Sequence, residues 1–114
     1  MLVGSKAPAA ANTHGVYFHS PLCGTCKVAK RMIKVMEETF PHFEIREVNI
    51  NEEIALAHSL KVTSIPCLII FQEEREAERL YAFRSLEHLY TKLKPYTVVE
   101  RLHKSFRLDQ TKGD

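Results

Sequence analysis

Residues 15–27, GVYFHSPLCGTCK, and residues 62–71, VTSIPCLIIF, decide the fold of this chain. The first stretch opens with β-branched and aromatic residues, which predict a short buried strand over 15–19. Pro21 interrupts the strand, and a helical pattern begins at Cys23. The Cys-Gly-Thr-Cys motif is therefore expected where a strand passes into the N-terminus of a helix.

This position gives the two cysteines a defined chemistry. Free amide groups and the positive end of the helix dipole stabilise a thiolate, so we expect Cys23 to be nucleophilic near neutral pH. Cys26 follows three residues later on the same helix face, a spacing at which a disulfide can close. The pair is thus arranged for thiol–disulfide exchange, in which Cys23 attacks a disulfide and Cys26 resolves the mixed disulfide.

The helix that carries the pair is predicted to run from Cys23 to about Thr39, because Pro41 ends it. Apolar residues recur along it at spacings of three and four, which predicts a single face packed against the core. The residues of that expected face are Val28, Met32, Val35, Met36 and Thr39 or Phe40.

The rest of the chain predicts further strands and helices in alternation. A strand is expected over 43–50, and Asn51 is a suitable N-cap for a helix over 52–60. An apolar run predicts a central strand over 67–71, then a charged turn over 72–78 and an antiparallel strand over 79–83. Ser85 is expected to cap a helix that Pro95 breaks, and Val98, Val99, Leu102 and Phe106 predict one more helix over 96–106. The order β-α-β-α-β-β-α predicts an α/β fold with a four-stranded mixed sheet and an extra C-terminal helix.

These motifs resemble the thioredoxin-like family. The residues that carry the resemblance are 16–27, 48–51 and 62–71, and the likeness covers about residues 15–95. It implies a thioredoxin fold with a cis peptide bond at Ile65–Pro66. It also implies a substrate groove shaped by Thr25, Ile65 and Pro66, where backbone bonds hold an extended substrate segment.

Several positions depart from the family pattern. Leu22 stands where thioredoxins have a tryptophan, Thr25 where they have a proline, and Arg31 where a proline kinks their helix. Tyr17 aligns with a buried aspartate that helps deprotonate the second cysteine. The resemblance therefore leaves the proton acceptor for Cys26 open, and Glu47 is a candidate.

Composition limits the function further. A length of 114 residues fits one domain, with 1–14 as a flexible leader, 15–95 as the domain and 96–114 as a helical extension and tail. The net charge of +2, without a basic stripe among aromatic residues, gives no sign of nucleic-acid binding. Three cysteines are too few for a disulfide scaffold, and no apolar run is long enough to cross a membrane. We expect a cytoplasmic protein, because the leader does not have the pattern of a signal peptide.

The expected function is a cytoplasmic disulfide reductase that binds no cofactor and no metal ion. Its partners would be disulfide-bearing proteins or small disulfides, with a separate reductase or thiol as electron donor. One alternative is a metal-binding module, in which Cys67 and a histidine such as His19 would join the pair. Others are a non-catalytic binding domain and an oxidant or isomerase. Cys67, however, is expected to be a buried core residue.

Overall fold

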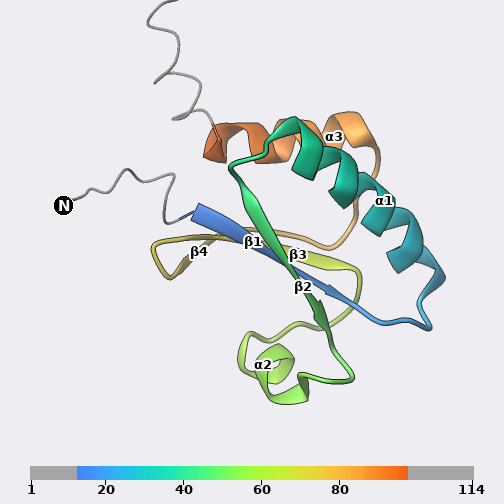
Figure 1. Ribbon diagram of the computed structural model, residues 1–114. Helices are drawn as coiled ribbons and strands as arrows, with labels where there is room; N and C mark the ends of the chain where they lie inside the picture. Colours follow the sequence, from blue (N-terminus) through green and yellow to red (C-terminus); the bar gives the residue numbers. More distant parts are fainter. Residues whose placement is uncertain (1–12, 98–114) are drawn as a thin grey trace, which may run out of the picture.

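The computed structural model describes residues 13–97 (Figure 1). Its elements are β1 (Thr13–His19), α1 (Gly24–Thr39), β2 (Glu44–Asn49), α2 (Ile54–Ser59), β3 (Cys67–Gln72), β4 (Arg75–Leu80), α3 (Leu86–Leu93) and the 3-10 helix η2 (Lys94–Tyr96). The predicted order of strands and helices is confirmed. The helix expected over 96–106 lies outside the described residues from Val98 onward, as do residues 1–12 of the expected leader.

The four strands form one mixed sheet in the order β2-β1-β3-β4. β1 pairs in parallel with β2, while β3 is antiparallel to both β1 and β4. Tyr17 on the central strand β1 lies opposite Glu47 of β2 and Leu68 of β3. This register places the residues that precede the cysteine pair in the middle of the sheet.

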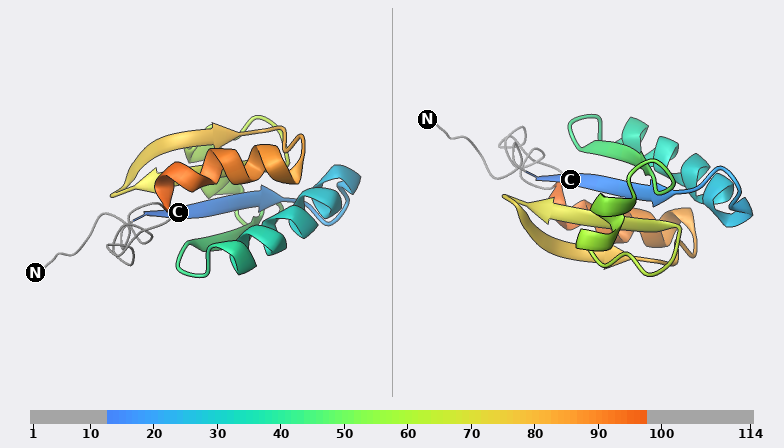
Figure 2. Two further views of the ribbon diagram at one scale, coloured as in Figure 1. Left: turned by 90° about the horizontal axis from the view of Figure 1, so that it is seen from above. Right: turned by 90° about the horizontal axis from the view of Figure 1, so that it is seen from below.

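Helices cover both faces of the sheet, and each face has its own apolar cluster. α1 and α3 lie on one face and α2 on the other (Figure 2). Tyr17, Leu68 and Ile70 are buried beneath α1 and α3 together with Ile33 and Leu89. On the other face, the cluster of Val16, Phe18, Val48, Cys67 and Ile69 packs against α2 and the loop that follows it.

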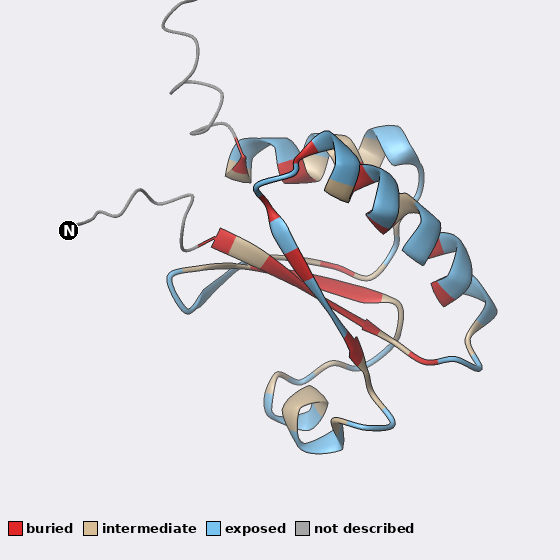
Figure 3. Ribbon diagram, in the orientation of Figure 1, coloured by how far each residue is buried: buried red, intermediate tan, exposed pale blue. Residues whose placement is uncertain are grey.

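The buried face of α1 differs in part from the prediction: Met36 and Phe40 are buried as expected, and Met32 packs against the same cluster. Its buried residues are Cys26, Ala29, Ile33 and Met36, whereas Val28 is 52% exposed and Val35 is 39% exposed (Figure 3). Val28 and Val35 each stand one position before a buried residue, Ala29 and Met36, which is a rotation of about 100° around the helix axis. The two valines were expected to be buried because they are strongly apolar. Ala29 and Cys26 contribute less to a hydrophobic pattern, but their small side chains fit closely against the sheet.

The N-cap predicted for α2 is also wrong. This helix begins at Ile54 after Glu53, which makes no side-chain capping bond. The amide of Asn51 instead donates from Nδ2 to Ser20 Oγ over 3.3 Å. The Asn51 side chain, expected to cap the next helix, therefore bonds to a residue far away in the sequence. This bond connects the turn after β2 to the loop that leads to Cys23.

The hairpin after β3 is tighter than expected. The turn comprises Glu73 and Glu74, whose φ angles of 55° and 80° are left-handed, and β4 begins at Arg75 rather than at Arg79. Charged residues predicted a long turn here, but β4 is an edge strand whose first residues are exposed to solvent. Residues 81–84 therefore form the connection to α3, and the predicted cap of that helix is confirmed by the bond from the His88 amide to Ser85 Oγ, 3.0 Å.

Candidate active site

The cysteine pair lies at the N-terminus of α1, immediately after the central strand. Cys23 is the N-cap residue and Cys26 belongs to the first turn. The two form a disulfide with their Cα atoms 5.2 Å apart. Cys23 is partly exposed, whereas Cys26 is only 3% exposed, so only the first cysteine is open to a large substrate.

Two donors face the sulfur of Cys23. The backbone amide of Cys26 donates to Cys23 Sγ over 3.1 Å, and Thr25 Oγ1 lies 3.3 Å from the same sulfur. Amide groups at a helix N-terminus stabilise negative charge, and so does the helix dipole. The same donors would stabilise a Cys23 thiolate once the disulfide is reduced.

The loop before the pair is fixed by Ser20. Its carbonyl accepts a bond from the Cys23 amide, 3.1 Å, and its hydroxyl oxygen accepts bonds from the Leu22 amide, 3.2 Å, and from Asn51. Leu22, which the resemblance aligns with a tryptophan, is 92% exposed beside the pair. The loop therefore presents an apolar side chain at the surface next to Cys23.

Tyr17 is fully buried beneath the first turn of α1, and its hydroxyl donates to the carbonyl oxygen of Cys26 over 2.7 Å. Burial, assisted by the negative charge of Glu47, raises the pKa of Tyr17 to about 12. The phenol is therefore neutral near neutral pH. It acts as a hydrogen-bond donor at the position that the resemblance aligns with a carboxylate.

Replacing Tyr17 by phenylalanine is expected to lower the free energy of unfolding by about 1 kcal/mol, because one buried hydrogen bond is lost while the ring remains. Urea unfolding of the reduced protein measures the change. Tyr90→Phe is the matched control, since the Tyr90 ring stacks on Phe40 and its hydroxyl makes no hydrogen bond within residues 13–97. Equal losses in the two variants would contradict a specific role for the Tyr17 hydroxyl.

Glu47 lies beside Tyr17 on the neighbouring strand, on the face that α1 covers. Lys30, one helical turn after Cys26, pairs with its carboxylate over 3.3 Å. The side chain of Glu47 keeps 29% of its surface exposed. The carboxylate predicted as a proton acceptor thus contacts the helix that carries the cysteines.

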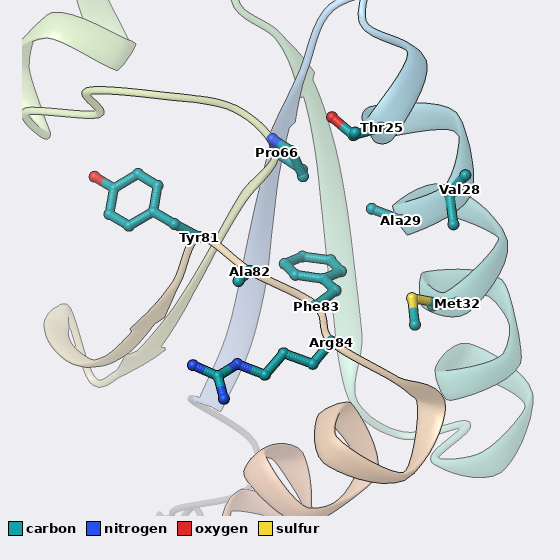
Figure 4. A pocket seen from close by; sticks show the side chains of 9 residues that line it. All are labelled: Thr25, Val28, Ala29, Met32, Pro66, Tyr81, Ala82, Phe83 and Arg84. Atoms are coloured by element: carbon teal, nitrogen blue, oxygen red, sulfur yellow. The ribbon is translucent and has the colours of Figure 1, made fainter.

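A groove of about 380 Å³ lies beside the pair, and Figure 4 shows Pro66 and Phe83 facing the residues of α1 across it. It is lined by Thr25, Val28, Ala29, Met32, Pro66, Tyr81, Ala82, Phe83 and Arg84. The peptide bond between Ile65 and Pro66 is cis. Of the three residues predicted to shape a substrate groove, Thr25 and Pro66 line it, whereas the side chain of Ile65 packs against the cluster on the α2 face.

The far wall of this groove is not predicted by the sequence pattern. The pattern predicts a strand over 79–83, which includes most of this wall, and it places Val28 and Met32 on the buried face of the first helix. Because Leu80 pairs with Leu68 in an antiparallel hairpin, the residues after Leu80 run back beside those before Leu68. The position of that hairpin was the signal that could have brought Tyr81 next to Pro66.

Cys67 and His19, which the metal-binding alternative would add to the cysteine pair, pack against different clusters of the fold. Cys67 is completely buried in the cluster on the α2 face, and burial raises the pKa of its thiol to about 11. The ring of His19 stacks on Tyr17 with 5.4 Å between the ring centroids. Within residues 13–97, no three histidine, cysteine, aspartate or glutamate residues form a group that could hold a metal ion. None of the helices described over these residues is long and apolar enough to cross a membrane.

Known proteins share this sequence pattern and this fold. Residues 7–95 match the sequence model of the thioredoxin family. The thioredoxin-like protein YusE of Bacillus subtilis is 34% identical over 79 residues, which cover 69% of this chain and 74% of YusE. A thioredoxin of Chlamydia pneumoniae is 31% identical over 74 residues, or 65% of this chain and 72% of its own. A mutant thioredoxin from Halobacterium salinarum superimposes with a TM-score of 0.70 at 19% identity, covering 78% of each chain.

The chain therefore belongs to the thioredoxin family. It has the thioredoxin fold, and it is a thiol–disulfide oxidoreductase whose CxxC motif comprises Cys23 and Cys26.

Proposed function

We propose that this protein is a cytoplasmic disulfide reductase in which Cys23 is the nucleophile and Cys26 the resolving thiol. The observation that carries the assignment is the asymmetry of the pair. The sulfur of Cys23 accepts a hydrogen bond from the backbone amide of Cys26 at the helix N-terminus. Cys23 is partly exposed, whereas Cys26 is buried. A reductase needs a compartment in which thiols stay reduced, and this supports the cytoplasm.

The reaction consists of two exchanges. The Cys23 thiolate attacks one sulfur of the substrate disulfide, the substrate S–S bond breaks, and the leaving thiolate takes a proton from solvent. Cys26 then loses its proton and attacks Cys23 Sγ, which releases the second substrate thiol and forms the Cys23–Cys26 disulfide. Two electrons pass to the substrate, and a separate reductase or a small thiol returns them to the pair.

The groove supplies the substrate site in this proposal. An extended segment beside the substrate disulfide would pair with the backbone at Ile65 and Pro66, while its side chains meet the largely apolar wall formed by Thr25, Met32 and Phe83. Backbone pairing holds many sequences equally well. Such backbone pairing suits disulfide-bearing proteins as substrates. Small disulfides can react with Cys23 without any backbone pairing.

A redox titration tests the assignment as a reductase. After equilibration in dithiol/disulfide buffers, free thiols are alkylated and the protein is weighed, with the modified cysteines assigned by peptide mapping. We expect one two-electron step at Cys23 and Cys26 with a midpoint near the roughly −270 mV of thioredoxin. A midpoint of about −120 to −180 mV indicates an oxidant or isomerase instead. The absence of a Cys23–Cys26 disulfide at every potential contradicts the redox function altogether.

Glu47 is proposed as the proton acceptor for Cys26. Two contacts support this role: Lys30, one turn after Cys26, binds the carboxylate, and Tyr17, whose hydroxyl binds the Cys26 carbonyl, is its neighbour in the sheet. The raised pKa of Tyr17 argues against the phenol as a base. Glu47 is the carboxylate that the register of the sheet places beside Tyr17.

In Glu47→Gln, resolution of the mixed disulfide is expected to slow by about 100-fold at neutral pH, the lower range for loss of a general base. The defect should shrink as the pH rises, because a growing fraction of Cys26 is then already a thiolate. Stopped-flow measurement of thiol release from a preformed Cys23 mixed disulfide gives the rate. Glu44→Gln, an exposed carboxylate on the same strand, is the control. Equal rates in both variants would remove Glu47 from the mechanism.

A further inference from the structure

Arg79 of β4 uses all five of its N–H donors. Nε and Nη2 donate to the two carboxylate oxygens of Glu76 over 2.7 and 2.8 Å. Nη2 also donates to the carbonyl of Leu60, 2.7 Å, while Nη1 donates to the carbonyl of Lys61 and to the Tyr81 hydroxyl, both 3.0 Å. One side chain thus joins β4 to the end of α2 and to the connection after β4.

The two carbonyls belong to the start of the loop that leads to Pro66. Leu60 is the C-cap residue of α2, and Lys61 has a left-handed φ of 57°. The hydroxyl oxygen of Tyr81 also lies 3.4 Å from the backbone nitrogen of Thr63 and 3.4 Å from its Oγ1. The loop is therefore held at its first two residues by Arg79 itself and at Thr63 through Tyr81, which also lines the groove.

The chemistry of these contacts favours a rigid attachment. The carboxylate of Glu76 is held bidentately, and the bonds from Arg79 lower its pKa. The guanidinium is a planar group whose five donors point in fixed directions, while a lysine ammonium has only three donors on a flexible stem. Lysine at this position would keep the charge and lose the geometry.

We propose that Arg79 is a positioning residue, which fixes the 60–66 loop against β4 so that the backbone at Pro66 is ordered before a substrate binds. The proposal rests on the proposed function, because it takes that backbone as the substrate site. A loop that is ordered in advance does not lose its freedom on binding, so an extended peptide binds it more tightly. A small disulfide without a peptide backbone gains nothing from this order.

The test compares two substrates of the full-length protein. Reduced wild type and Arg79→Lys are mixed with a disulfide-linked extended peptide and, separately, with 5,5′-dithiobis(2-nitrobenzoic acid). We expect the peptide concentration that gives half the maximal single-turnover rate to rise about tenfold in Arg79→Lys, equivalent to about 1.4 kcal/mol of binding. The maximal rate with the peptide, and the rate with the aromatic disulfide, should stay within about twofold of wild type.

Two further variants separate the possible outcomes. Arg46→Lys changes an arginine that is also paired with a glutamate, Glu53, but lies on the opposite edge of the sheet, and it should behave as wild type. Tyr81→Phe keeps the ring but removes the hydroxyl that both Arg79 and Thr63 contact, and it leaves the pair of Arg79 and Glu76 in place. It should weaken peptide binding in the same direction, and it decides the question if Arg79→Lys does not fold. Unchanged peptide binding in both Arg79→Lys and Tyr81→Phe, or equal losses with both substrates in either of them, overturns the proposal. If wild type itself reduces neither disulfide, the proposed function has failed, a result distinct from any difference among the variants.

Discussion

Replacement of Cys26 by serine is expected to trap a covalent mixed disulfide between Cys23 and the substrate, whereas replacement of Cys23 by serine should abolish exchange. Cys26 lies buried behind Cys23 and is proposed to perform the second step alone. Without it, the first exchange still proceeds and the adduct persists. Without Cys23, the remaining pair thiol is 3% exposed and lies behind the helix N-cap, so turnover should fall by about 1,000-fold or more.

The adducts identify the nucleophile directly. Each variant is incubated with a disulfide-linked peptide, quenched by alkylation and analysed by intact mass, followed by peptide mapping under non-reducing conditions. The peptide should be attached to Cys23 in Cys26→Ser, and no adduct should form in Cys23→Ser. Cys67→Ala is the control, because Cys67 is buried on the other face of the sheet and should leave the exchange rate within about twofold of wild type. An adduct on Cys26 in Cys23→Ser would reverse the assigned roles.

The cysteine pair could be placed from sequence because its signals are local. A strand pattern, the break at Pro21 and a helical pattern adjoin the motif, so the junction between β1 and α1 followed directly. The strand directions in the sheet could also be predicted from the sequence, because the length of each connection restricts whether the next strand is parallel or antiparallel. The short link after β3, for example, requires the antiparallel pairing that the structure shows.

The features that sequence patterns missed depend on contacts between distant segments. Asn51 bonds to Ser20, 31 positions away, instead of capping the next helix. Arg79 and Tyr81 reach the loop after α2, at separations of 18 and 19 positions. A charged edge strand looks like a turn when its partner is not known, and the wall of the groove could not be recognised until the hairpin was placed.

The largest stability effect is expected at Ile33, where alanine should reduce the free energy of unfolding by about 2–5 kcal/mol. The Ile33 side chain is completely buried between α1 and the sheet, so truncation removes apolar contacts and leaves a cavity. Val35, two residues further along the same helix, is the matched control. Because it is 39% exposed, and because alanine is the better helix former, Val35→Ala should change stability by no more than about 0.5 kcal/mol.

Urea unfolding of both variants in excess reductant, at unchanged m-value, measures the two changes without a contribution from the Cys23–Cys26 disulfide. A larger loss in Val35→Ala than in Ile33→Ala would show that α1 packs on the face that carries Val28 and Val35. The result also bears on the chemistry, because Cys26 shares its buried face with Ile33. The rotation of α1 that buries Ile33 is the same rotation that hides the sulfur of Cys26 and leaves Cys23 at the surface. Packing of the helix core therefore determines which cysteine is exposed to solvent.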